Sequence, residues 1–368
     1  MNSVPLVDFA PMLRIALLVG VMALLPLSYV WLRSRGAQPR QRLATLTAIT
    51  LFLTFDLIVF GAFTRLSDSG LGCPDWPGCY GQASPLGAVG DIRLAEQLAP
   101  TGPVSWGKAW IEMIHRYLAM TVGVLILVMA LVSWLERRQL PFSPWWPTVT
   151  LVWVLVQGLF GKYTVTLKLY PAIVTLHLLG GMLLLAMVAA QHEAFARRVS
   201  PLTQRTRRVL LAVLAALVVQ IALGGWVSTN YAVLACREFP LCNGQWWPET
   251  DFASGFTVLR ELGRAGDGTA LSMAALVAIH MAHRWFALVV TLLMLGLVRC
   301  LWREQGPAPR RFAWLLLALL LAQLLSGLSN VVLGWPLPAA LAHSAGAAAT
   351  VLALVMLWAR GRLAARAT

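Results

Sequence analysis

The chain has 368 residues, of which 59% are hydrophobic and 12% are charged, and its mean hydropathy is +0.72. Since about a quarter of the residues of a soluble globular domain are charged, this composition excludes a water-soluble enzyme, a disordered chain and a coiled coil. A protein that crosses a membrane several times fits. The net charge of +14 would suggest nucleic acid in a soluble protein, so the positions of the basic residues decide its meaning.

Nine segments are apolar enough to cross a bilayer as helices, which takes about 20 residues each. In chain order they are 12–32, 43–65, 110–134, 146–165, 172–192, 207–229, 273–299, 312–333 and 338–359. The first has only Arg14 before its apolar run and lacks a small-residue cleavage site, so we predict a retained helix rather than a signal peptide. Nine crossings put the two termini on opposite sides of the membrane.

Arginine gathers on one side of these segments. The short loops on that side and the C-terminal tail hold most of the 29 Lys and Arg residues: Arg33, Arg35, Arg40, Arg42, Arg137, Arg138, Arg197, Arg198, Arg205, Arg207, Arg208, Arg299, Arg303, Arg310, Arg311, Arg360, Arg362 and Arg366. The positive-inside rule makes these loops cytoplasmic, with the C-terminus inside and the N-terminus outside. The charge therefore indicates orientation and contact with lipid head groups, and it does not indicate nucleic acid.

The chain contains an internal duplication. Residues 61–79, GAFTRLSDSGLGCPDWPGC, align without gaps with residues 224–242, GGWVSTNYAVLACREFPLC. Further matches follow at a nearly constant offset, as expected for a repeat of one structural unit. The matched pairs are Cys73 with Cys236, Cys79 with Cys242, Gln157 with Gln323, Gly161 with Gly327, and His177 with His343.

Each copy is predicted to be a four-helix unit, and both copies enter the membrane in the same direction. The predicted fold is an all-α polytopic membrane protein, with two pseudo-twofold-related four-helix bundles plus one extra N-terminal transmembrane helix. The predicted domains are 1–42, the extra helix and its basic cytoplasmic loop; 43–192, the N-terminal bundle; 193–206, a cytoplasmic linker; 207–359, the C-terminal bundle; and 360–368, the cytoplasmic tail.

Four of the six histidines fall at equivalent positions, His115 and His177 in the first copy and His283 and His343 in the second. At a rise of about 1.5 Å per residue, each lies roughly 7–15 Å below the outer end of its helix. Two histidines at one depth on separate helices of a bundle suit bis-histidine haem ligation. A single membrane histidine more often makes an interhelical hydrogen bond. Four at duplicated positions favour haem, and zinc fits less well because each bundle offers only two.

Arginine follows the histidine in one helix of each copy. Arg116 comes directly after His115, and Arg284 directly after His283. A charge inside a membrane helix is costly and usually functional. Two interpretations stay open for both arginines, namely pairing with haem propionates and snorkelling to the interface.

The two copies differ at one position beside the histidine. Glu112 lies three residues before His115, on the same face of the helix, and the equivalent residue in the second copy is His280. We expect Glu112 to accept or donate a proton at the first site. The second site would then hold a fixed electron-transfer haem. A structural partnership of Glu112 with Arg or His is the alternative.

Two cysteine pairs lie in the predicted outer loops, Cys73 with Cys79 and Cys236 with Cys242. The outer compartment is oxidising, and the Pro and Gly residues of the first loop favour a tight turn. We therefore expect one disulfide in each loop. A structural role is the interpretation for the second pair, while a redox role stays open for the first.

Together these residues resemble haem A synthase, a membrane family of cytochrome oxidase assembly. The resemblance covers about residues 43–359 and rests on RLSDSGLGCPDWPGC at 65–79, EMIHR at 112–116, His177, HR at 283–284, and His343. It implies oxidation of the C8 methyl group of haem O to a formyl group, which gives haem A. It further implies successive hydroxylation, with water as the proposed oxygen source.

The resemblance also implies roles for residues. His115 and His177 look like the iron ligands of the substrate haem, Glu112 like the catalytic acid, and His283 and His343 like the ligands of a haem b cofactor. Haem O is the implied substrate, and haem O synthase and cytochrome oxidase assembly factors are candidate partners. The cysteine pair of the first outer loop is typical of bacterial members, which implies the bacterial cytoplasmic (inner) membrane. Members commonly have eight helices, so the first helix here is an addition.

Two other classes of function stay open. A di-haem b membrane electron carrier, such as a quinol-linked cytochrome subunit, fits the bis-histidine symmetry but leaves Glu112 without a role. A haem or small-molecule transporter fits the parallel repeat. It would not need two closed bis-histidine sites.

Overall fold

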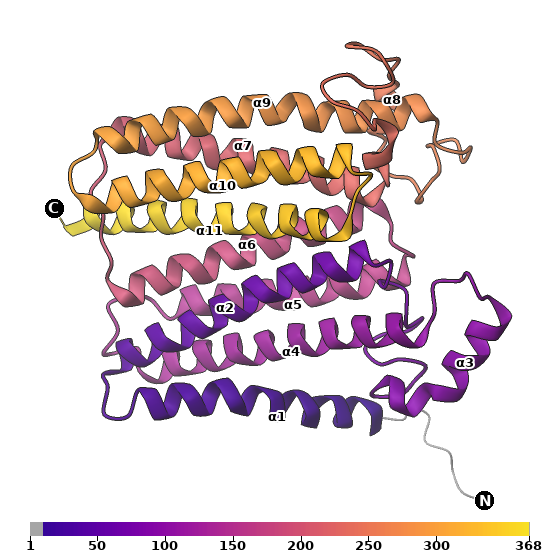
Figure 1. Ribbon diagram of the computed structural model, residues 1–368. Coiled ribbons are helices and arrows are strands. Elements are labelled where there is room, and N and C mark those ends of the chain that lie inside the picture. The colour runs from indigo at the N-terminus through magenta and orange to yellow at the C-terminus, as the bar shows by residue number, and fades with distance from the viewer. Residues whose placement is uncertain (1–9, 368) are drawn as a thin grey trace, which may run out of the picture. The chain divides into compact units, whose positions relative to one another are not determined.

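The computed structural model describes residues 10–367; residues 1–9 and 368 and the side chains of Arg366 and Ala367 lie outside that description. Every regular element within residues 10–367 is a helix, and nine of them are long and apolar enough to cross a membrane (Figure 1). These nine are α1 (Ala10–Arg33), α2 (Pro39–Leu66), α4 (Trp106–Leu135), α5 (Trp145–Thr166), α6 (Pro171–Ala196), α7 (Gln204–Thr229), α9 (Met273–Arg303), α10 (Pro307–Val332) and α11 (Leu337–Ala367). The prediction of an all-α polytopic membrane protein is confirmed.

Four shorter helices lie in the two long loops. The first loop holds η1 (Pro85–Ala88) and α3 (Val89–Leu98), and the second holds η2 (Ala232–Ala235) and α8 (Phe252–Gly255). These loops were predicted only as outer segments that carry the cysteine pairs. The helices within them are too short to stand out from a hydropathy profile.

The long helices begin where the sequence carries helix-start residues. Pro39, Pro171 and Pro307 occupy the first turns of α2, α6 and α10, where the missing N–H of proline costs nothing. Ser105 and Ser272 cap α4 and α9, and each hydroxyl accepts a backbone N–H three residues on, at 3.3 and 3.1 Å. The corresponding helices α4 and α9 therefore start with the same chemistry.

Several helices run beyond their predicted bounds. The predicted segment 110–134 becomes α4, which begins at Trp106, and 338–359 lies within α11, which continues into the predicted tail 360–368. An apolar window stops at the first polar residues. The backbone hydrogen bonds continue past them, because long basic side chains reach the interface from a helical position.

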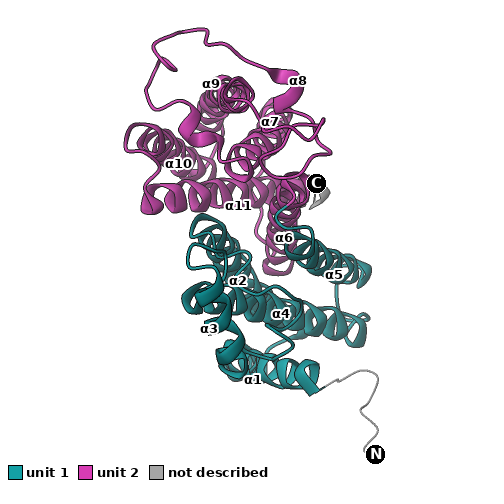
Figure 2. Ribbon diagram, turned by 90° about the vertical axis from the view of Figure 1, so that its right-hand side faces the viewer, with its two compact units in different colours: residues 1–169 teal, residues 170–368 magenta. Residues whose placement is uncertain are grey.

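Contacts divide the chain into two compact units, residues 1–169 and 170–368 (Figure 2). In the first unit, α4 packs against α1, α2 and α5, and α1 also touches α2. In the second, α7, α9, α10 and α11 contact one another in a closed cycle, and α6 packs on α7 and α11. Each unit therefore presents its own set of helices for a site.

The unit boundary separates α6 from the other helices of the predicted first bundle, 43–192. Thr175 of α6 lies 3.5 Å from Thr229 of α7, measured between their hydroxyl oxygens. At the other end of α6, the buried Glu193 carboxylate accepts two hydrogen bonds from Arg360 of α11, at 2.8 and 2.9 Å. These contacts explain why α6 clusters with the second unit. The predicted domain boundaries and pseudo-twofold relation stay predictions.

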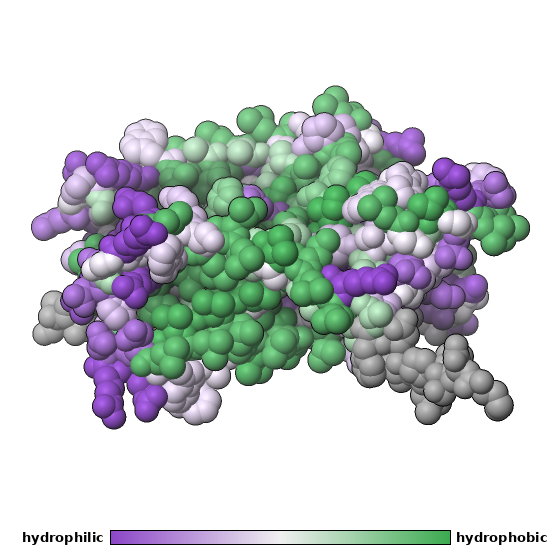
Figure 3. All heavy atoms as spheres, turned by 90° about the horizontal axis from the view of Figure 1, so that it is seen from below, coloured by the Kyte–Doolittle hydropathy of each residue, from purple (hydrophilic) through white to green (hydrophobic). Residues whose placement is uncertain are grey.

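The surface of the face that carries α1 is typical of a membrane protein. Figure 3 shows a broad hydrophobic area on this face with hydrophilic residues at both ends. Large side chains such as Leu17, Leu24 and Leu25 of α1 are exposed there. Exposed apolar surface of this extent is stable only in lipid.

Candidate functional site

The first disulfide loop is joined to α4 by a buried carboxylate, Glu112, and a buried cation, Arg116. The backbone N–H of Cys73 donates to the Glu112 carboxylate at 2.8 Å, and Arg116 pairs with the same carboxylate. Both side chains are under 10% exposed. Residues four apart lie on one face of a helix, so α4 presents both charges to the loop. The acid expected from the sequence is thus held between the loop and a cation.

Arg116 also holds the loop itself. One guanidinium nitrogen donates to the backbone carbonyls of Asp75 at 2.8 Å and of Gly78 at 2.6 Å. The other pairs with Glu112. A planar guanidinium can satisfy several acceptors at fixed angles, which suits this bridging position. The predicted pairing of Arg116 with a haem propionate stays a prediction.

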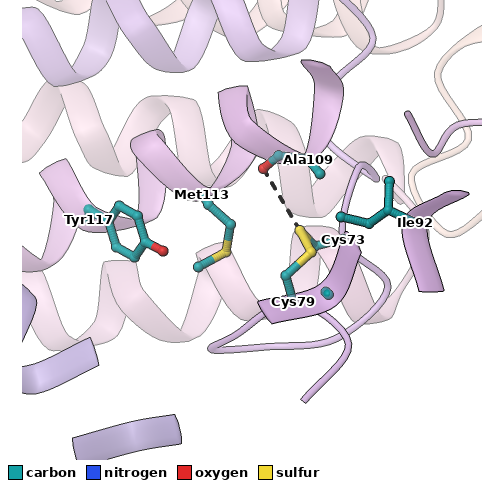
Figure 4. Packing of buried hydrophobic residues seen from close by; sticks show 7 residues of the cluster. Cys73, Cys79, Ile92, Ala109, Met113 and Tyr117 are labelled. Carbon is teal, nitrogen blue, oxygen red and sulfur yellow. Dashed lines mark hydrogen bonds between the residues drawn. A yellow bond between two sulfur atoms is a disulfide. The ribbon is translucent and has the colours of Figure 1, made fainter. Parts of the chain in front are cut away.

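Cys73 and Cys79 form the expected disulfide, and neither side chain is exposed. They belong to a hydrophobic cluster with Ala109, Met113 and Tyr117 of α4 (Figure 4). The cluster also includes Ala88 and Ile92 of the short helices in the same loop. The disulfide is therefore packed into unit 1 rather than displayed to solvent.

Glycine permits the close approach of this loop. A Cβ added at Gly72 would lie 2.5 Å from the carbonyl carbon of Lys108, a backbone atom that cannot move aside.

The Asp75 carboxylate accepts the backbone N–H groups of Tyr80 at 2.6 Å and Gly81 at 2.7 Å. Burial, together with the charges of Asp91 and Asp75, raises the pKa of Tyr80 above its usual value.

The second disulfide loop repeats this construction with a different partner. Cys236 and Cys242 are bonded, as expected. Arg284 donates to the carbonyls of Leu241 at 3.1 Å, Glu238 at 3.0 Å and Cys236 at 3.3 Å. Its Nε–H donates to Nε2 of His280 at 3.1 Å. A neutral acceptor therefore stands where Glu112 stands in the first copy.

Two histidines of the second unit face each other. The ring centroids of His283 on α9 and His343 on α11 are 6.5 Å apart, and the ring planes are inclined at 79°. The Gln220 amide nitrogen lies 3.2 Å from Nδ1 of His283, and the Ser326 hydroxyl lies 3.0 Å from Nδ1 of His343. Polar neighbours of this kind fix the orientation of ligand imidazoles.

This pair fits a haem iron. Metal–imidazole bonds are about 2 Å long, so the gap between the two rings can hold one ion bonded to a nitrogen of each. Haem supplies the other ligands of its iron, and a bis-histidine site needs only two protein groups. Among residues 10–367 no group of three or more His, Cys, Asp or Glu side chains could hold a metal ion. The haem b site predicted for this pair stays a prediction.

The first pair of histidines is divided between the units. His115 of α4 stacks on Phe60 of α2, with ring centroids 6.3 Å apart and planes inclined at 15°. His177 lies on α6 in the second unit, and its buried Nδ1 has no hydrogen-bond partner among the described residues. A buried polar atom without a partner calls for an explanation, and a ligand bound nearby is one. Their pairing at one haem stays a prediction.

Three glycines make room for imidazole rings. A Cβ at Gly61 would come 2.9 Å from Cε1 of His115, and one at Gly224 would come 3.0 Å from Cε1 of His283. The third is Gly327, at 3.2 Å from His343. The alignment already matched the first two as the leading residues of the repeated segments. The alignment of Gly61 with Gly224 could therefore have indicated that both lie beside a site, but neither was predicted as a site residue. Gln220 and Ser326 were not predicted either.

Comparisons with known proteins identify the family of the chain. A family model, COX15-CtaA, described as cytochrome oxidase assembly protein, matches residues 44–355. A protein of Shewanella oneidensis named "Heme A synthase" is 38% identical over 85% of this chain and 95% of its own length. Proteins of the same name from Sphingopyxis alaskensis and Halalkalibacterium halodurans are 29% and 25% identical, over 79% and 82% of this chain and 84% and 89% of their own lengths.

Proposed function

Since the chain belongs to the COX15-CtaA family of cytochrome oxidase assembly proteins, we propose that it is a haem A synthase. It is a membrane oxidoreductase that converts the C8 methyl group of haem O to the formyl group of haem A. The observation that carries this function is the similarity to the Shewanella protein, which spans 85% of the chain. A di-haem b electron carrier is not favoured by these relatives.

Glu112 takes the role of proton acceptor. Oxidation of a methyl group with oxygen from water releases protons, which a basic group near the reacting carbon must take up. The carboxylate is buried three residues from His115 and is held by the Cys73 N–H and by Arg116. Those two donors stabilise the charged form in a place where burial opposes it. A buried carboxylate fixed in this way can accept a proton at the first site.

His115 and His177 are the proposed iron ligands of the substrate haem. The support is their equivalence to His283 and His343 in the repeat, together with the buried unpaired Nδ1 of His177. Gly61 leaves the ring of His115 the space that it needs beside α2. These residues would hold the haem that carries the reacting methyl group.

His283 and His343 are the proposed ligands of a haem b. When bound there, haem b would supply one-electron transfer. Gln220 and Ser326 orient the two imidazoles, and His280 stands in this copy where the first copy has Glu112. Arg284 donates to carbonyl groups of the loop. To pair with a haem propionate, as proposed, it would have to give up one or more of these hydrogen bonds.

The proposed location is the bacterial cytoplasmic (inner) membrane, with the N-terminus outside and the C-terminus in the cytoplasm. The arginine-rich loops support this orientation, and the two disulfides suit an oxidising outer side. Haem O enters as the substrate. Haem O synthase and cytochrome oxidase assembly factors are the proposed partners.

The test is production of haem A in a bacterial host that makes haem O but lacks its own haem A synthase. The chain is expressed in that host, and the haems are extracted from its membranes and separated by chromatography. The expected result is a haem A peak that appears with the chain and is missing with the empty vector. Haem O alone in both strains, with the chain present in the membrane, would contradict the proposal.

A further inference from the structure

Helix α1 is the part of the molecule that the proposed function does not use. It lies outside the range of the family model, which starts at residue 44. It packs on α4 and α2 through a narrow stripe of buried residues, among them Ile15, Val19 and Ala23. Figure 1 shows α1 beside α4, with its N-terminal end toward the first disulfide loop.

A groove of about 520 Å³ separates parts of α1 and α4. It is lined by Leu18, Val21, Met22, Trp110, Ile114 and Tyr117. The one hydroxyl in this set, on Tyr117, donates to the carbonyl of Ala83 at 2.6 Å and is thus satisfied elsewhere. The groove therefore offers apolar surface and aromatic rings.

The bottom of the groove adjoins the cluster that contains the first disulfide. Tyr117 belongs to that cluster, and Met22 and Trp110 pack against it. An empty space beside this cluster would forfeit dispersion contacts along its whole wall. In a bilayer the available filler is hydrocarbon.

The tail of a haem at His115 is not the occupant that this geometry favours. The residues of α4 that line the groove, such as Ile114 and Tyr117, face α1. His115 instead contacts Phe60 and Gly61 of α2, on another face of the same helix. A chain attached to a haem at His115 would have to pass around α4. A quinone ring fits poorly too, because it would find few polar partners among the six side chains.

A cation lies at the N-terminal end of the groove. Arg14 is exposed and stands four residues before Leu18, hence on the same face of α1. It lies about 6 Å from the start of the helix, within reach of lipid head groups for a long basic side chain. The next basic residue of α1 is Arg33, at the opposite end. The position of Arg14 suits a phosphate.

We propose that the groove between α1 and α4 binds an acyl chain of an anionic phospholipid, with the lipid phosphate at Arg14. Lipid tails are as apolar as leucine, so the groove by itself does not select one lipid over another. Arg14 supplies the selection by charge. The added helix thus carries a lipid site that covers the disulfide cluster from the membrane side.

The test uses the full chain in nanodiscs with equal amounts of phosphatidylglycerol and phosphatidylethanolamine. The protein is released in the gas phase, and native mass spectrometry counts the lipids that stay bound. Wild type is expected to retain one phosphatidylglycerol in preference to phosphatidylethanolamine. Arg14→Gln should reduce that preference about fivefold, the value of one basic residue near an anionic head group. Arg33→Gln, the matched control at the other end of α1, should leave it unchanged.

A second pair of variants tests the groove. Leu18→Trp fills the space and should abolish retention of the lipid, while Leu25→Trp, about two turns further along α1 and outside the groove lining, where Leu25 is 77% exposed, should not. Equal retention of the two lipids by wild type would overturn the proposal. So would an isoprenoid quinone retained in place of a phospholipid, or unchanged retention in Leu18→Trp. Because Arg14 is exposed, its variant keeps the test valid if Leu18→Trp does not fold.

Discussion

The loops closed by Cys73–Cys79 and by Cys236–Cys242 share one construction and differ in one buried side chain. In each, an arginine from the following long helix donates to carbonyls of the loop. The first arginine also meets the carboxylate of Glu112, and the second meets the neutral ring of His280. The same construction therefore holds both loops in place, and the side chain one turn before the arginine decides whether that arginine meets a carboxylate or a neutral ring.

Replacing that acid should have the largest effect. Glu112→Gln keeps the size of the side chain and removes the base, so haem A formation should fall by about 10²–10⁴-fold, the usual contribution of a positioned acid or base. Chromatography of extracted haems measures the product. His280→Gln, the matched change in the second loop, should leave more than half of the activity. Equal losses in both variants would remove the proposed distinction between the loops.

Glycine-to-alanine changes separate the two copies by their consequences. In Gly61→Ala the new methyl group meets His115, and in Gly224→Ala it meets His283, at 2.9 and 3.0 Å from Cε1. We expect Gly61→Ala to displace the ring of His115 and to lower haem A formation by about tenfold or more, because a reacting group that is out of position reacts more slowly. The b-type optical spectrum should stay intact in this variant. The second should lose the b-type spectrum. Identical spectra in both variants would contradict the assignment of one haem b to the second copy.

Removing the arginines should destabilise the two loops unequally. Arg116→Gln leaves a buried carboxylate without its cation, which costs roughly 3–5 kcal/mol when a buried pair is broken. Arg284→Gln leaves neutral acceptors, at about 1–3 kcal/mol. Thermal unfolding of the purified chain in detergent compares them. The double variant Arg116→Gln with Glu112→Gln should recover much of the stability lost in Arg116→Gln, because no buried charge is then left unpaired. A double variant whose loss of stability equals the sum of the two single losses would contradict the ion-pair account.

The pH response should also differ between the loops, by a small amount. Burial and two nearby carboxylates raise the pKa of Tyr80, while Asn243 stands at the aligned position of the second loop. A raised folded-state pKa means that the neutral phenol stabilises the first loop, and that this stability is lost as the pH rises above 10. Ultraviolet titration of wild type and Tyr80→Phe should show one late-titrating tyrosine disappear. If the titration curve of Tyr80→Phe matched that of wild type at its alkaline end, the raised pKa of Tyr80 would be contradicted.

Much of the architecture followed from the hydropathy of the sequence, because a spanning helix is set by about 20 apolar residues in a row. Cys73 and Cys236 were identified with their partners, since a repeat places them alike. The loop contacts of Arg116 and Arg284 were not foreseen. They depend on how the loops fold back over α4 and α9, which no local pattern encodes. The groove beside α1 escaped prediction for the same reason, since it arises from two helices that are distant in the sequence.

The sequence also did not predict that α6 clusters with the second unit. Its contacts with α7 and α11, including Glu193 with Arg360, cluster it with the second unit. The repeat instead assigns it to the first copy, by the match of His177 with His343. Repeat equivalence reports common descent of the segments, and contacts report which surfaces pack. The two need not divide a chain at the same residue.

The central claim is that the two copies bind different haems, and one spectrum tests it directly. The reduced-minus-oxidised optical spectrum is recorded for the purified chain carrying either His115→Ala or His283→Ala. The account predicts that the low-spin b-type band persists in His115→Ala and disappears in His283→Ala. Loss of that band in His115→Ala with retention in His283→Ala would contradict it.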